Sequence, residues 1–280
     1  MRMLNKIRMW RDKTIIVAVC VCITTIVTFA GNKTTTKDTK TLIVDQKVAL
    51  SALVSLIDGH IQKVADCLTL VAITDQVKSG NWDKMKDLLS EIEKVNISSV
   101  IWFVRPDGSY YTTEKGLVTD QNLKDRDYFP RVMAGEPVIG SLVVSKSTGK
   151  KSVIVAVPIK NKEKIVGAIG ASIFLEQFSD LILQEMHLPD DIVFYALDKN
   201  SETVIHRAAF RVFEQPTLLG NETLATAIKE IVSRSEGSVE YVFQGTNRAV
   251  YFQTSPLTGW RIVLGKVMVI TEPKTKTGGK

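Results

Sequence analysis

At 280 residues the chain exceeds the usual size of one domain, roughly 100–200 residues, so one large or two modest domains can each bury a core. The net charge of +6 does not indicate a nucleic-acid partner, because it is concentrated at the two ends of the chain. Residues 1–13 hold five cations and one anion, a charge of +4, and residues 271–280 hold three cations and one anion, a charge of +2. The body between these ends is therefore neutral.

Cysteine and histidine limit the chemistry that the chain can perform. Cys20 and Cys22 lie in an apolar run and leave Cys67 alone in the body, so no intradomain disulfide framework is possible. The three histidines are far apart and show no spacing typical of metal ligands. The sequence also contains no Gly-x-Ser-x-Gly, Walker-type, His-Glu-x-x-His or Rossmann motif. We therefore expect no cofactor, no metal site and no catalysis.

An uncharged run of 17 residues, from Thr14 to Ala30, follows the basic N-terminus. Its length is at the lower limit for a membrane-spanning helix, about 17–25 residues. The cations before it predict that residues 1–13 stay cytoplasmic and that the following residues are exported. A cleaved signal peptide is the alternative, since the run is short and ends in small residues, but no A-x-A-like cleavage site stands out. We expect a single-pass anchor at residues 14–30 in the cell (inner) membrane, with the bulk of the chain periplasmic or extracellular and a basic tail at residues 269–280.

Residues 31–95 are expected to form a stalk and leading helices. From Thr41 to Leu70, apolar residues recur mostly three or four apart, which predicts one amphipathic helix of about eight turns. A helix of this length that continues a membrane anchor would be a stalk and a candidate seam for a homodimer; alternatively it packs on its own sheet, and both can hold at once. A second helix is predicted from Lys84 to Val95, with Asn81 or Asp83 as its N-cap.

From residue 96 onward, short β-type runs alternate with turn signals. Pro106-Asp107-Gly108 lies between two such runs and is a strong hairpin signal. A long connection, Glu114 to Glu136, separates this hairpin from three further strands. The predicted strands are Ser98 to Val104, Ser109 to Thr113, Val138 to Val144, Lys151 to Ile159 and Lys164 to Ile173. Two leading helices and an antiparallel sheet of about five strands predict a membrane-distal PAS-like module at residues 96–187, with a ligand pocket between the sheet and the long connection.

A smaller copy of this order follows at residues 188–268. A helix from Phe174 to Met186 ends before Pro189, and a second helix from Glu222 to Ser233 begins after Asn221 as its N-cap. The predicted strands are Ile192 to Leu197, Thr203 to His206, Ser238 to Phe243, Ala249 to Thr254 and Arg261 to Val267. The repeated order predicts a second, membrane-proximal module. The fold class that follows is α+β, with a long N-terminal stalk helix and two tandem PAS-like modules with antiparallel sheets.

The order of these pieces resembles the double Cache (dCache) family of extracellular sensor domains. The resemblance covers nearly all of residues 32–268. It rests on the hairpin VIWFVRPDGSYY, the segment LKDRDYFPRVMAGEPVIG, the strands STGKKSVIVAVPI and KIVGAIGASI, and the ending LTGWRIVLG. It implies a small-molecule sensor for signal transduction, as in chemotaxis, whose membrane-distal module usually binds the ligand.

The resemblance also implies site residues. The family's amino-acid-binding subset has an Arg-x-Trp-Tyr motif that contacts the ligand carboxylate, and Arg126, Tyr128 and Phe129 occupy those places here. An arginine supplies a bidentate fork to a carboxylate, and a tyrosine a hydroxyl beside an aromatic wall. The subset's tyrosine five residues before the arginine is Gln121 here, and its aspartate for the ligand amine looks like Ser172. A small anionic ligand without an amine, such as a short organic acid, is therefore expected rather than an α-amino acid.

Two questions about this site stay open in the sequence. Trp102 and Phe103 alternate on one strand and Tyr110 and Tyr111 on the next, so one of each pair faces the pocket; we include Tyr111 among the expected ligand contacts. The alternative role of the Arg126 segment is structural. In that case the arginine pairs with Asp120, Asp125 or Asp127 to pin the loop, and the aromatic residues fill the core.

The expected partners follow from the same reasoning. No helical signalling linker, kinase, cyclase or methyl-accepting region follows Lys280 in this sequence. We therefore expect either the sensor fragment of a truncated chemoreceptor or histidine kinase, or a stand-alone binding subunit that signals through a cytoplasmic or membrane partner. Two other classes remain: a ligand-free Cache scaffold that acts in interaction or assembly, and a hydrolase, for which no nucleophile–base pair is found.

Overall fold

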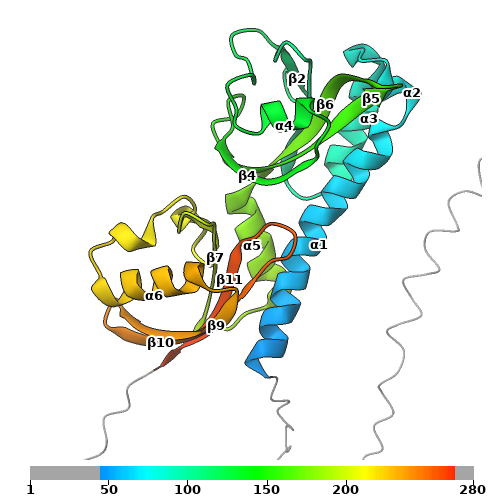
Figure 1. Cartoon of the computed structure of the whole chain (residues 1–280). Coiled ribbons are helices and arrows are strands. Elements are labelled where there is room, and N and C mark those ends of the chain that lie inside the picture. Colours follow the sequence, from blue (N-terminus) through cyan, green and yellow to red (C-terminus); the bar gives the residue numbers. More distant parts are fainter. Residues whose placement is uncertain (1–44, 269–280) are drawn as a thin grey trace, which may run out of the picture. The chain divides into compact units, whose positions relative to one another are not determined.

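Two antiparallel sheets follow a long helix in the part of the chain that the structure describes, residues 45–268 of a computed structural model (Figure 1). The predicted α+β fold with two tandem sheets is confirmed. The helix, α1, spans Gln46–Ala72 and begins at Asp45, whose carboxylate accepts a hydrogen bond from the backbone N–H of Lys47. The expected membrane helix at residues 14–30 and the two basic ends lie outside the described residues.

The first module contains a sheet of six strands in the order β3-β2-β1-β6-β5-β4. It consists of α2 (Asp75–Lys78), α3 (Trp82–Val95), β1 (Ser99–Val104), β2 (Tyr110–Thr112), β3 (Gly116–Val118), α4 (Phe129–Met133), β4 (Val138–Val144), β5 (Lys151–Asn161) and β6 (Lys164–Phe174). The long connection predicted between the hairpin and β4 is therefore not structureless. It supplies β3, which pairs with β2 and brings the sheet to six strands instead of five, and the short helix α4.

The second module repeats this plan with a sheet of five strands in the order β8-β7-β11-β10-β9. It consists of α5 (Leu175–Met186), β7 (Ile192–Leu197), β8 (Thr203–His206), the 3-10 helices η1 (Ala209–Arg211) and η2 (Pro216–Leu218), α6 (Glu222–Ser233), β9 (Glu236–Phe243), β10 (Thr246–Thr254) and β11 (Arg261–Met268). Every neighbouring pair of strands in it is antiparallel.

Two asparagines determine where helices begin. The side chain of Asn81 accepts a hydrogen bond of 2.9 Å from the backbone N–H of Asp83, so Asn81, rather than Asp83, is the N-cap of α3. Asn221 accepts one of 2.8 Å from the backbone N–H of Leu224 and caps α6 as predicted. Each bond satisfies one of the N–H groups that the first turn of a helix leaves without an intrahelical partner.

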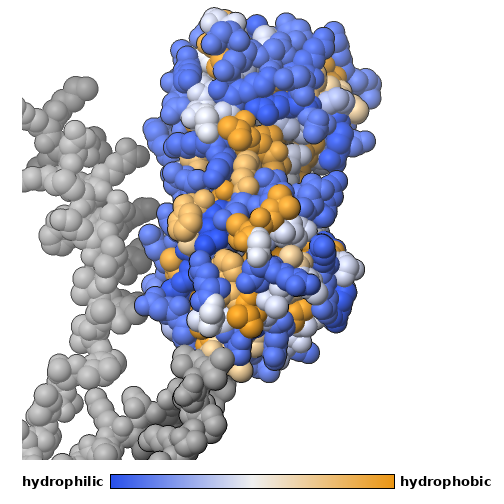
Figure 2. Space-filling model, turned by 90° about the vertical axis from the view of Figure 1, so that its left-hand side faces the viewer, coloured by the Kyte–Doolittle hydropathy of each residue, from blue (hydrophilic) through white to orange (hydrophobic). Residues whose placement is uncertain are grey.

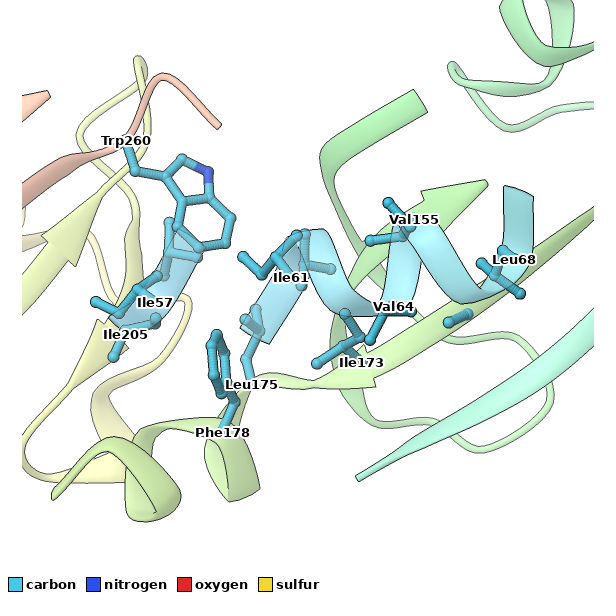
Figure 3. Packing of buried hydrophobic residues seen from close by; sticks show 14 of the residues in the cluster. Ile57, Ile61, Val64, Leu68, Val155, Ile173, Leu175, Phe178, Ile205 and Trp260 are labelled. Carbon is cyan, nitrogen blue, oxygen red and sulfur yellow. The ribbon is translucent and has the colours of Figure 1, made fainter. Parts of the chain in front are cut away.

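One face of α1 forms a core shared by both sheets (Figure 3). Ile57 lies beside Ile205 and Trp260 of the second module, whereas Val64 lies beside Ile173 of the first. Burial of one such aliphatic side chain contributes about 1.5–3 kcal/mol relative to leaving it exposed. The helix therefore stabilises both modules through one continuous row of side chains.

The length and composition of α1 would also allow it to cross a membrane, and among residues 45–268 it is the one helix that meets this criterion. Its buried residues, however, are those that pack on the sheets: Leu50, Leu53, Val54, Ile57, Ile61, Val64, Ala65, Leu68 and Ala72. The apolar character of α1 is thus explained by its place in the core of the fold.

The faces of the two sheets that point away from α1 have cores of their own. In the first module this face is covered by α4 and by the rest of the segment between β2 and β4. In the second module α6 covers it. The same strands thus alternate between the shared core and a separate core on the other face, and the polar residues considered below lie in these separate cores.

Candidate ligand-binding site

Strand alternation places Trp102 and Tyr110 on the face of the first sheet that α4 covers. Both side chains belong to the separate core of this face, together with Tyr128 and Phe129. Phe103, by contrast, points into the core shared with α1. The pairing of β1 with β6 and β2 decides which residue of each alternating pair faces the candidate site.

Tyr111 lies on the opposite face from these residues. Its ring stacks on Trp82 of α3 with 5.2 Å between the ring centroids, and the guanidinium of Arg105 lies 4.8 Å from its ring centre. The structure therefore does not bring Tyr111 to the other expected contacts. Tyr111 directly follows Tyr110 on the strand, and successive side chains of a strand point to opposite faces of the sheet. Tyr110 takes its place on the candidate face.

Arg126 is held by the turns that lead into α4. Its backbone N–H donates to Leu123, at 3.0 Å, and its carbonyl accepts from the N–H of Phe129, at 2.9 Å. Its Nη2 donates to the carbonyl of Val144, at the end of β4, at 2.7 Å. Its Nε is buried and has no hydrogen-bond partner among residues 45–268. One strong donor of the guanidinium is therefore left for another acceptor.

The neighbouring aspartates do not form ion pairs with Arg126. Asp125 binds Lys146 instead, with 2.6 Å between Oδ1 and Nζ, and this bond lowers the pKa of the Asp125 carboxyl. The ion pairs within the described residues join Arg126 to none of Asp120, Asp125 and Asp127. The loop is thus held by the ion pair between Asp125 and Lys146 and by the hydrogen bond from Arg126 to the Val144 carbonyl. The alternative in which Arg126 holds the loop through an ion pair with an aspartate is not what the structure has.

Two tyrosine hydroxyl groups lie within the electric field of Arg126. Burial raises the pKa of Tyr128, and the nearby positive charge of Arg126 acts in the opposite direction. Burial likewise raises the pKa of Tyr110, again against the effect of Arg126. The Tyr110 hydroxyl donates to Gln121 Oε1 at 3.0 Å. At neutral pH both hydroxyls keep their protons: that of Tyr110 is donated to Gln121, and that of Tyr128 can be donated to an anion near Arg126.

Ser172 faces the same side of the sheet and is already engaged. Its Oγ accepts a hydrogen bond of 3.2 Å from the indole Nε1 of Trp102. The indole lies flat over Gly170, where an added Cβ would stand 2.3 Å from the Trp102 ring. The indole also lies beside Tyr128, with 6.0 Å between the ring centroids. Ser172 thus offers a hydroxyl, not a carboxylate, and Trp102 covers part of the sheet beside it.

Phe129 is a core residue in this arrangement. It opens α4, and its side chain is buried with Val132 of the same helix against the sheet. It therefore positions the Arg126 turn and supplies an apolar wall. The sequence left open whether Trp102 or Phe103, and whether Tyr110 or Tyr111, faces the site, and the pairing of β1 and β2 selects Trp102 and Tyr110. The Val144 carbonyl was not assigned to the site, because its bond to Arg126 has no local signal.

A surface pocket lies next to the cluster, but Arg126, Tyr110 and Tyr128 are not among its lining residues. This pocket, of about 540 Å³, is lined by Asp120, Gln121, Asn122, Lys124, Asp125 and Lys146. Gln121 belongs to both regions, since it also accepts the hydrogen bond from Tyr110. Within residues 45–268, no three His, Cys, Asp or Glu side chains gather closely enough to hold a metal ion. The arrangement is suited to hold an anion by hydrogen bonds and charge.

Comparisons with known proteins point to one fold. The family model described as the Cache domain, in its double form, matches residues 28–269. An extracellular ligand-binding receptor from Desulfohalobium retbaense has a similar structure, with a TM-score of 0.60, 13% identity and coverage of 79% of this chain and 40% of the receptor. This chain thus spans less than half of that receptor's length.

Two chemoreceptor domains are similar to a comparable degree. The ligand-binding domain of the Pseudomonas fluorescens chemoreceptor CtaA, in complex with L-serine, has a TM-score of 0.60, 14% identity and coverage of 79% of this chain and 93% of that domain. That of the Pseudomonas aeruginosa amino acid chemoreceptor PctB, in complex with L-Gln, has a TM-score of 0.57, 13% identity and coverage of 79% and 87%. No curated protein matches the sequence. At these identities the structures establish the fold.

Proposed function

The chain belongs to the double Cache family of sensor domains, and on that premise we propose that it is an extracytoplasmic sensor that binds a small carboxylate in its first module. The observation that carries this proposal is the buried Nε of Arg126, which lacks a hydrogen-bond partner among residues 45–268. A carboxylate at this position would accept a charge-assisted hydrogen bond from the guanidinium.

The ligand of this proposal carries no amine. The two similar chemoreceptor domains are in complex with L-serine and L-Gln, so a carboxylate and an amine are both present in their ligands. Here the strand position expected to hold an aspartate for the amine is Ser172, whose Oγ accepts a bond from Trp102. Of the two aspartates that flank Arg126 in the sequence, Asp125 is paired with Lys146. A short organic acid, rather than an α-amino acid, fits this set of donors.

Matched pairs of ligands test the proposal. Thermal unfolding of the whole chain would be measured with short acids and their α-amino counterparts, such as propionate against alanine and succinate against aspartate. A ligand that binds only the folded state stabilises it by about 2.7 kcal/mol at a hundred times its Kd. We expect a saturable rise in Tm with at least one acid and a smaller rise with its amino counterpart. Greater stabilisation by the amino acid would contradict the amine-free ligand.

A ligand-free scaffold for interaction or assembly is the second candidate, and one observation favours it. The indole of Trp102 occupies the sheet over Gly170, and a continuous apolar core fills much of the face where a ligand would lie. A scaffold would show no saturable stabilisation by any acid or amino acid in the same measurement. The scaffold would then use its surface, rather than Arg126, for its function.

Membrane attachment and partners belong to the same proposal. We propose that residues 14–30 anchor the chain in the cell membrane, that residues 1–13 are cytoplasmic, and that the two modules lie outside the cytoplasm. A homodimer through α1 would use the face of the helix that its own sheets leave free, where Val48 and Leu70 are 61% and 66% exposed. A cytoplasmic or membrane partner would then receive the signal.

A further inference from the structure

A small cavity lies in the separate core of the second module. Its volume is about 30 Å³, and it lies between the sheet, α6 and the segment that joins β8 to α6. On its apolar side are Leu224 and Ile228 of α6. The polar residues that line it are Tyr195, Thr203, His206, Arg211, Glu214, Tyr241 and Arg248. This concentration of polar side chains is unusual for a core that is otherwise aliphatic and aromatic.

Strand register brings these residues together from distant parts of the sequence. Tyr195 of β7 lies opposite His206 of β8, and Tyr241 of β9 lies opposite Arg248 of β10. Residues directly opposite each other on neighbouring strands point to the same face of the sheet. The two hydroxyl groups meet below α6, with 3.4 Å between the oxygens of Tyr195 and Tyr241.

His206 can donate a hydrogen bond into this cavity. Its Nδ1 accepts the backbone N–H of Ala208 at 2.8 Å, so in the neutral ring the hydrogen is on Nε2. Burial, and then the positive charges of Arg211 and Arg248, lower the pKa of His206 to about 4. The ring is therefore neutral at pH 7, and the hydrogen on Nε2 of this cavity-lining residue can be donated without adding a charge.

Arg248 supplies a positive charge that forms no ion pair within residues 45–268. Its Nε is buried without a hydrogen-bond partner among these residues. The other cation of the cavity, Arg211, is paired with Glu214 at 2.7 Å. The guanidiniums of Arg248 and Arg211 lie 4.9 and 5.5 Å from the ring centre of Phe243. A buried donor of this kind costs free energy unless an acceptor is bound to it.

The cavity is reached from the surface. A groove of about 500 Å³ is lined by His206, Arg211, Phe243 and Arg248, which also line the cavity, and by Arg207 and Phe210. Phe210 is 74% exposed. In the space-filling view, hydrophobic residues lie exposed among hydrophilic ones in the middle and lower parts of this face, whereas the top of the molecule is predominantly hydrophilic (Figure 2). A ligand can therefore enter past Arg248 without crossing the sheet.

We propose that the second module contains a binding site of its own for a short monocarboxylate anion. Its carboxylate accepts hydrogen bonds from Arg248 and His206, and its alkyl end lies toward Leu224. One water needs about 10–15 Å³ of such volume, so the cavity holds only a few non-hydrogen atoms, as in acetate. The site is separate from the one around Arg126 and does not depend on it.

The test uses the whole chain, with acetate as the probe and chloride at equal ionic strength as the reference. Thermal unfolding would be followed as a function of acetate concentration for the native sequence and for Arg248→Gln, Arg248→Lys, Arg234→Gln and Arg126→Ala. Arg234 is the matched control, because it lies in the same module over the ring of Phe252 and is paired with Glu230 at the surface. Circular dichroism of each variant verifies the fold.

We expect saturable stabilisation by acetate that Arg234→Gln retains and that Arg126→Ala retains at least in part, since only the fraction bound at the first site depends on Arg126. In Arg248→Gln the half-saturating concentration should rise at least about tenfold, because a charge-assisted hydrogen bond is lost. If Arg248→Gln does not fold, Arg248→Lys should show a smaller rise. No saturable effect in the native chain, equal losses in Arg234→Gln and the Arg248 variants, or complete loss in Arg126→Ala alone would each overturn the proposal.

Discussion

Gly170 is the residue that allows Trp102 to lie against the first sheet. A Cβ at this position would stand 2.3 Å from the indole, far inside van der Waals contact. The indole in turn donates to Ser172 and lies beside Tyr128. A ligand that reached Arg126 would thus contact the rings of Trp102 and Tyr128, which pack against each other without it. The proposed site is narrow at this end, and this favours a short ligand.

The two tyrosines of the hairpin show what a sequence reveals about a single residue. Alternation predicts that one of Tyr110 and Tyr111 faces the pocket, and the structure selects Tyr110. The choice depends on which face of β1 the helices cover, and this is a long-range property. The resemblance alone pointed to Arg126, whereas its bond to the Val144 carbonyl joins residues 18 apart and has no local signal.

The depressed pKa of His206 predicts a dependence of stability on pH. The unfolded chain binds a proton near pH 6.5, but the folded chain does so only near pH 4, because burial, Arg211 and Arg248 oppose protonation. Between these values the unfolded state holds more protons, so the contribution of His206 to stability is complete above pH 6.5 and is lost as the pH falls toward 4. The loss should amount to about 1–3 kcal/mol.

Chemical denaturation of the native chain and of His206→Asn between pH 7.5 and pH 4 measures this effect. Asparagine keeps an acceptor for the Ala208 N–H but does not titrate, so the variant should lose less stability on acidification. Glu214, Tyr195 and Tyr241 also face His206, and they are common to both proteins. Equal slopes for the two proteins would show that the histidine does not titrate as described.

At the scale of elements, helix ends and long strands could be predicted from the sequence. The structure of the segment between β2 and β4, which covers the first sheet, could not. Asn221 and the apolar period of α6 are local signals, and the helix lies where they predict it. The strand β3 has three residues and α4 has five, too few for any periodicity to develop. Both depend on contacts with the sheet below them. The segment that carries Arg126 was therefore the least predictable part of the first module.

The helix α1 is the element through which the two modules can influence each other. Its buried residues contact the first sheet, the second sheet and α5. If a ligand binds one arrangement of the first module better than another, it shifts the balance between them, and a helix packed on both sheets would carry this change. This relay is part of our proposal for the function.

A cavity in α1 tests the coupling. Ile61 is fully buried in the shared core, and Ile61→Ala should cost about 2–5 kcal/mol. Because the core is continuous, hydrogen exchange of both β6 and β11 should become faster in parallel. Ser55→Ala, on the exposed face of the same helix, should change stability by less than about 0.5 kcal/mol. Faster exchange in one strand alone would show that the modules unfold independently.

At the scale of the whole molecule, one plan is used twice. Each sheet packs one face on α1 and covers the other with its own helices and loops. Each module also contains an arginine whose buried Nε has no hydrogen-bond partner within the described part of the chain: Arg126 in the first module and Arg248 in the second. The sequence predicted the repeat, because the order of strands and helices recurs along the chain. It did not reveal the role of the second arginine, since the cavity that Arg248 lines is built from four separate strands, including its own, together with α6 and the segment that joins β8 to α6.

The central claim is that Arg126 binds the carboxylate of a ligand in the first module. The most direct measurement is calorimetric titration of a stabilising short acid into the native chain, into Arg126→Ala and into Arg131→Ala, whose exposed arginine on α4 pairs with Glu136 at the surface. We predict that Arg126→Ala weakens binding by about 10- to 100-fold, as expected for the loss of a charge-assisted bond, and that Arg131→Ala binds as the native chain does. Unchanged affinity in a folded Arg126→Ala variant would contradict the account.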